Sequence, residues 1–134
     1  MAPITDISEA AKALIRRCIR SVTDVETLLL LAREQGKTWR GEELSRALYL
    51  TAGAASEQLM HLEALGLVRS TLDEHGERWF RYAPSHPALH EQVGALATDY
   101  AQRRVRVIEY IYSRPSDSVH SFARAFKLRK EPEE

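Results

Sequence analysis

The chain has 134 residues, one cysteine and equal numbers of basic and acidic residues, 19 of each, so its formal net charge is zero. One cysteine excludes an internal disulfide framework, and no apolar run approaches the roughly 18 residues that a membrane-spanning helix needs. A neutral chain favours neither nucleic acid nor membrane as a partner. The length suits one domain over residues 1–134, and without a signal-peptide pattern at the N-terminus we expect a cytoplasmic protein.

Two apolar helices are predicted in the first 36 residues. Residues 6–20 form the N-terminal helix, because apolar residues recur there at intervals of three and four. These residues are Ile4, Ile7, Ala11, Leu14, Cys18 and Val22. Ser21 and Asp24 have the spacing of a capping box for the second helix. Leucines at 28–31 make this second helix apolar nearly all round, so we expect it to be central.

Two short helices and a tight turn are predicted next. Residues 37–39 are expected to add a short strand, and residues 42–48 form the first helix, although Arg40 stands where Ser, Thr or Asp is the usual cap. Thr51 supplies the N-cap of the second helix, and Gly66 ends it in a left-handed turn. Its buried stripe is Ala55, Leu59 and Leu62.

A hairpin and a long helix complete the chain. Residues 67–72 and 78–82 are predicted strands around a turn, which makes a wing. Residues 88–112 are predicted to form one continuous helix with two apolar stripes, one for its own domain and one for a second subunit. The first stripe is Leu89, Val93, Leu96, Tyr100 and Val107; the second is Ala97, Ala101, Val105, Ile108 and Tyr112. Residues 116–134 are predicted to form a short helix and a charged tail.

The residues that carry a family resemblance are EELSRAL, the following LT-A--A---L-HLEALGLV, and RWFRY at the end of the hairpin. Residues 21–82, about half of the chain, resemble the winged-helix domain of MarR, ArsR and PadR regulators. The resemblance implies a mainly α fold with a small β-wing, a winged helix-turn-helix core at 21–83, and flanking dimerisation helices at 6–20 and 86–113. It further implies a homodimer that binds double-stranded DNA through the second helix of the motif and controls transcription.

Candidate DNA contacts follow from the helical period of that second helix. With its apolar stripe inward, Gly53, Glu57, Met60 and Ala64 point outward. Glu57 is suited to accept from a cytosine amino group and Met60 to touch a thymine methyl. The full candidate set is Thr51, Ser56, Glu57, Gln58, Met60 and His61 on this helix, with Arg78 and Arg81 on the wing.

The charge pattern argues in the other direction. Between residues 51 and 82 three arginines stand against five carboxylates, whereas phosphate binding normally rests on Lys and Arg. Residues 103–130 hold eight basic residues against two acidic ones, and Arg103, Arg104 and Arg106 are candidates for contact with phosphate or with an acidic protein. Two hypotheses therefore stand: a sequence-specific DNA-binding regulator, or a winged helix repurposed for protein–protein interaction without DNA binding.

Other chemistry finds little support in the sequence. Cys18 lies on an apolar stripe, which indicates a buried residue that packs like a small hydrophobic side chain. A redox switch is the alternative. His86 and His90 are spaced like half of a metal site, but an ordinary helix start is favoured. The aromatic residues of the wing favour packing over a ligand box. Because no nucleophile–base set, phosphate loop or metal quartet is present, we expect no enzyme activity and no cofactor or metal.

Overall fold

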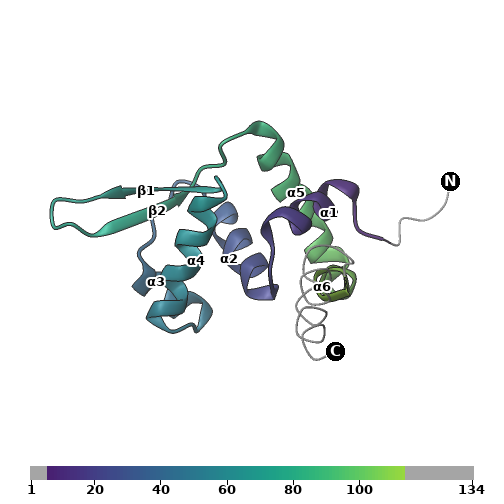
Figure 1. Ribbon diagram of the computed structural model, residues 1–134, viewed down its shortest axis with the longest axis horizontal. Helices are drawn as coiled ribbons and strands as arrows, with labels where there is room; N and C mark the ends of the chain where they lie inside the picture. The colour runs from purple at the N-terminus through teal and green to yellow at the C-terminus, as the bar shows by residue number, and fades with distance from the viewer. Residues whose placement is uncertain (1–5, 114–134) are drawn as a thin grey trace, which may run out of the picture.

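The computed structural model describes residues 6–113, which form six helices and one antiparallel two-stranded sheet (Figure 1). In chain order the elements are α1 (Glu9–Cys18), α2 (Val22–Arg33), α3 (Gly41–Leu48), α4 (Ala52–Ala64), β1 (Val68–Leu72), β2 (Arg78–Tyr82), α5 (Pro87–Gln102) and α6 (Arg104–Ser113). The expected mainly α fold with a small wing is thereby confirmed. The predicted helix and tail at 116–134 lie outside the described residues. Within residues 6–113, no helix combines the length and apolarity needed to cross a bilayer.

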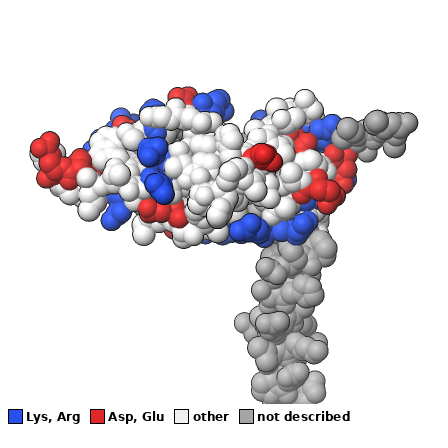
Figure 2. All heavy atoms as spheres, turned by 90° about the horizontal axis from the view of Figure 1, so that it is seen from above, with Lys and Arg blue, Asp and Glu red and all other residues white. Residues whose placement is uncertain are grey.

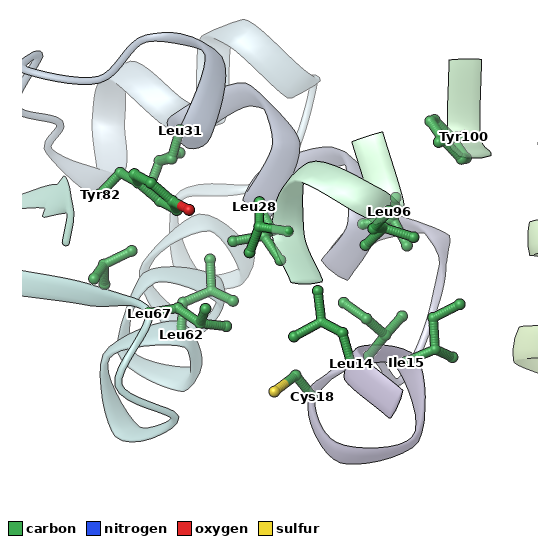
Figure 3. Packing of buried hydrophobic residues seen from close by; sticks show 14 of the residues in the cluster. Leu14, Ile15, Cys18, Leu28, Leu31, Leu62, Leu67, Tyr82, Leu96 and Tyr100 are labelled. Atoms are coloured by element: carbon green, nitrogen blue, oxygen red, sulfur yellow. The ribbon is translucent and has the colours of Figure 1, made fainter. Parts of the chain in front are cut away.

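The core joins α1, α2, α4 and α5 around the predicted apolar stripes. Figure 3 shows leucines from α1, α2, α4 and α5 converging, with Cys18 at the edge of the cluster. Cys18 is 3% exposed, as the packing interpretation predicts, and burial raises the pKa of its thiol. The apolar stripe of α1 is buried within the chain itself, because Ala11, Leu14 and Ile15 are fully buried. We expected α1 to supply part of a dimer interface, but its apolar face is already occupied.

The start of α2 differs from the predicted capping box. Ser21 occupies the N-cap position but makes no side-chain capping hydrogen bond. Asp24 instead accepts from the backbone N–H of Arg20 at 2.6 Å and from the Arg20 guanidinium. The carboxylate thus caps one residue earlier than predicted, because Arg20 offers it both a backbone and a charged side-chain donor. Leu28 and Leu31 are buried, and α2 contacts α4, α5 and β2, as its predicted central place requires.

The helix-turn-helix forms as predicted. Thr51 caps α4 by accepting from the Ala54 N–H at 3.1 Å, and its three stripe residues are fully buried. Gly66 has φ +80°, and the Leu67 N–H reaches back to the Leu62 carbonyl at 3.0 Å, which closes the helix in a Schellman-type stop. Tyr49 adopts φ 57° in the turn between α3 and α4. This left-handed residue lets the chain turn from α3 into α4 within three residues.

The wing pairs β1 with β2 in register from Val68 opposite Tyr82 to Leu72 opposite Arg78. Asp73 holds the turn, because its carboxylate accepts from the N–H groups of His75 and Glu77 and from the indole of Trp79. The predicted short strand at 37–39 is reduced to a single bridge between Trp39 and Phe80. The wing therefore projects as a narrow hairpin beyond the helices (Figure 1).

The predicted continuous helix at 88–112 is wrong, because the chain breaks between α5 and α6. Arg103 leaves the helical conformation at φ −138° and ψ 50°. Its guanidinium lies 3.1 Å from Asp99, a buried carboxylate that also accepts from the Ser8 N–H at 2.8 Å. After the turn, Val107 and Ile111 are buried in the core, and α6 contacts α1.

Candidate nucleic-acid interface

The exposed face of α4 consists of small and polar residues. Gly53, Ser56, Glu57 and Met60 are exposed, as the helical period predicts, and Met60 is 60% exposed. A Cβ atom added at Gly53 would meet no neighbouring protein atom within 4 Å. A duplex could therefore approach the first two turns of α4 closely. Contact of these residues with DNA stays a prediction.

Two candidate residues of α4 lie elsewhere than expected. Gln58 is 6% exposed, and His61 places Nε2 3.2 Å from the Cys18 carbonyl and 3.7 Å from Asp24. Both were predicted as DNA contacts, whereas in the structure the α1–α2 junction packs over their side of α4. In this structure Gln58 and His61 join α4 to the junction instead of facing solvent.

On the wing side of α4 lies an open groove of about 440 Å³. Ser56 and Met60 form its α4 wall, and Arg40 and Arg78 face them from the α3 start and from β2. Arg40 donates to Glu77 at 2.6 Å and its guanidinium stacks 5.0 Å from the centre of the Trp79 ring. The groove is thus lined by two arginines and also by two carboxylates, Glu42 and Glu77.

Two further arginines face each other on the wing. Arg69 is the register partner of Arg81, and both are exposed. Like charges directly opposite each other destabilise a strand pair, and within residues 6–113 neither arginine pairs with a carboxylate. An anion bound between them would relieve the repulsion. Arg81 was a predicted DNA contact. Arg69 was not, and it lies opposite Arg81 because the two are register partners.

On the other side of α4, Arg20 connects two carboxylates. Its Nε lies 2.9 Å from Asp24, which is fully buried, and its Nη1 lies 3.0 Å from Glu57. Burial disfavours ionised Asp24, but hydrogen bonds from Arg20 and Gln58 outweigh it and hold the pKa of this carboxyl below its ordinary value. Arg20 also lowers the pKa of Glu57. Both carboxylates therefore stay ionised at neutral pH.

The acid sensitivity of folding should depend on Asp24. Because the folded pKa of Asp24 is depressed, its ionised form stabilises the protein above the unfolded pKa of about 4, and this contribution fades as the pH falls towards the folded pKa. We expect Asp24→Asn to cost about 2 kcal/mol at pH 7 and less near pH 3. Urea unfolding at both pH values measures this, with Glu91→Gln on exposed α5 surface as the control. A gap between wild type and variant that widens on acidification would contradict the assignment.

Two carboxylates of the α4–wing segment have arginine partners from other parts of the chain. Glu57 and Glu77 each pair with an arginine from outside the α4–wing segment, Arg20 and Arg40 respectively, but Arg20 also pairs with Asp24 and Arg40 also pairs with Glu42. Each partner is 37 residues away in sequence, and no local motif announces it. Because each of these arginines is shared with a second carboxylate, the acidic excess of the segment remains, and red side chains gather at the tip of the wing, at the left end of Figure 2.

The arginines at the end of α5 and the start of α6 lie far from the wing (Figure 1). Arg103 pairs with Asp99, and Arg106 pairs with Asp6 and Glu109. Arg104 stacks on the Tyr100 ring with 4.5 Å between the guanidinium carbon and the ring centre. Their predicted contact with phosphate or an acidic partner stays a prediction, and within this chain they lie away from α4 (Figure 1).

A second, larger cavity of about 780 Å³ lies between α2, the end of α3, β2 and α5. Tyr82 and Tyr100 reach its wall, where the Tyr82 hydroxyl lies 2.8 Å from His90 Nδ1 and burial raises the pKa of Tyr82 to about 12. His90 thus has a tyrosine partner, and in residues 6–113 no group of three or more ligating side chains is placed to hold a metal ion. Trp39 and Phe80 are buried, as packing of the wing sheet predicts.

Solved structures share this fold at low sequence identity. The DNA complex of MepR from Staphylococcus aureus matches with a TM-score of 0.55 at 17% identity, over 91% of this chain and 83% of that chain. MepR, described as a transcription regulator of the multidrug efflux pump MepA, matches with a TM-score of 0.53 at 15% identity, over 90% and 87%. No protein-family model and no curated protein sequence matches this chain. The protein thus has the winged-helix fold of these transcription regulators, and the predicted resemblance is confirmed at the level of the fold.

Proposed function

We propose that the protein is a sequence-specific DNA-binding transcription regulator that acts as a homodimer. The observation that carries the proposal is the exposed face of α4, which has small and polar residues between two flanks of arginines. Arg20 lies on one flank, and Arg40 and Arg78 lie on the other. A helix in the major groove has a phosphate strand on each side, so arginines on both flanks suit that placement. The solved DNA complex of MepR, which shares the fold, supports it.

The same surface yields the candidate base contacts. Ser56 and Met60 remain candidates for reading base edges, since they are exposed beside the groove. Arg78 and Arg81 remain candidates for phosphate contact on the wing, and Thr51 lies at the exposed N-terminus of α4. Gln58 and His61 leave the set, because they serve the contact between α4 and the α1–α2 junction.

Binding to duplex DNA of random sequence tests the proposal. We expect fluorescence anisotropy to show binding near 20 mM salt and at least a tenfold loss of affinity between about 50 and 200 mM, because phosphate contacts release counterions. A genomic selection for bound fragments then identifies the operator. No detectable binding near 20 mM salt would contradict the proposal.

The acidic wing tip favours the second candidate function, a protein-interaction module. Asp73, Glu74 and Glu77 lie at the tip, where Glu77 is held by Arg40. Such a tip would be repelled by a minor groove and attracted by a basic protein surface. Under this alternative the duplex assay stays negative, and a partner recovered from the native host loses affinity when Glu74 is changed to Lys.

A further inference from the structure

Arg20 divides its donors between a buried and an exposed carboxylate. One edge of the guanidinium binds Asp24, with Nε 2.9 Å from Oδ2 and Nη2 3.0 Å from Oδ1. The other edge binds Glu57, with Nη1 3.0 Å from Oε2 and Nη2 3.2 Å from Oε1. Asp24 is fully buried, whereas the Glu57 side chain is 57% exposed. The first edge is therefore fixed, and the second faces the open surface.

The second edge lies beside the exposed face of α4. Glu57 follows Ser56 by one residue, which is a rotation of about 100° around the helix. Ser56 faces the wing groove, so Glu57 and Arg20 border the same exposed face on the side of the α1–α2 junction. A phosphate group presents two oxygens to an arginine edge in the same fork geometry as a carboxylate. Glu57 therefore occupies a position that suits a backbone phosphate.

We propose that this edge of Arg20 is a binding site for a DNA backbone phosphate, occupied in the free protein by Glu57, which competes with the phosphate. The inference rests on the proposed function, because it needs α4 to meet a duplex. Exposed ion pairs contribute little to stability, so Glu57 can swing away at small cost. Asp24 keeps the guanidinium in place when it does. Glu57 thereby lowers the affinity for DNA. When Glu57 moves away, this edge of the Arg20 guanidinium becomes free to contact the phosphate.

A set of charge-matched variants separates this role from simple neutralisation of Glu57. Glu57→Gln removes the competitor, and we expect about fivefold tighter binding to random duplex. The slope of log affinity against log salt should steepen by about 0.9, the value for one phosphate contact. Glu91→Gln removes the same charge from α5 and should leave both quantities nearly unchanged. This comparison needs no change at Arg20.

The deciding variant adds Arg20→Gln and Asp24→Asn to Glu57→Gln. The two added changes cancel in net charge, and with Glu57 already neutral there is no charge left for Arg20 to mask. We expect the triple variant to lose the fivefold gain and the steeper slope, with circular dichroism melting to establish that it is folded. If the triple variant binds as Glu57→Gln does, or if Glu57→Gln leaves the salt slope at the wild-type value, the phosphate site is overturned while DNA binding stands. If wild type and variants all fail to bind duplex near 20 mM salt, the proposed function fails as well.

Discussion

Gly53→Glu should lower the affinity for duplex DNA at least tenfold while making the protein more stable. The substitution places a carboxylate on the exposed first turn of α4, where it would face the phosphates on which binding depends. The fold should gain about 1 kcal/mol, because glycine is a poor helix former and α4 has no acidic residue near its positive end. A Cβ at this position meets no protein atom within 4 Å, so no clash opposes the gain.

Gly53→Gln separates charge from bulk in this experiment. Glutamine has nearly the same size and helix propensity but no charge, so it reports the cost of filling the space in front of α4. Thermal melting and duplex anisotropy measure the two effects on the same samples. The Gly53→Glu variant would contradict the prediction if it raised the melting temperature but bound duplex DNA as tightly as the wild type does. Any bound DNA would then lie away from α4.

The parts of the fold that the sequence predicts are those with local causes. Thr51, Gly66 and the turn at Asp73 each act on backbone groups within five residues, so their neighbours suffice to identify them. The apolar period of α4 is equally local. The break at Arg103 has a distant cause, because Asp99 bonds Ser8 and α6 packs on α1. The apolar period runs through the break without a signal, and only tertiary packing shows that the helix must turn.

The candidate site follows the same division. The period of α4 correctly exposes Ser56, Glu57 and Met60, since it depends only on which stripe is buried. It cannot show that the α1–α2 junction covers Gln58 and His61. The junction also supplies Arg20, 37 residues from its partner on α4. The sequence of a segment therefore does not show which of its carboxylates have arginine partners, because these partners come from elsewhere in the fold.

The proposed dimer rests on the second apolar stripe of α5 and α6. The break at Arg103 divides this stripe, and Ile108 is partly buried against the core. Ala97 and Ala101 on α5 and Val105 and Tyr112 on α6 stay exposed. Val105 is 67% exposed and Tyr112 is 62% exposed. Ala97 and Ala101 also wall the large cavity, so the apolar surface continues from the stripe towards α2. A second copy packed on α5 and α6 would remove this surface from water.

Val105→Glu should therefore separate the dimer. Burying a carboxylate in an apolar interface costs several kcal/mol, which raises the dissociation constant at least a hundredfold. The subunit should keep its fold, because the Val105 side chain faces solvent within one subunit while its neighbour Val107 stays in the core. Gln102→Glu adds the same charge to exposed α5 surface outside the stripe and should leave the dimer intact.

Size-exclusion chromatography with light scattering at micromolar concentration gives the mass of each species. Since two half-sites must be held together for tight operator binding, the monomeric variant should also bind a palindromic operator far more weakly than the Gln102→Glu protein does. A wild-type monomer, or a Val105→Glu dimer, would remove α5 and α6 as the interface.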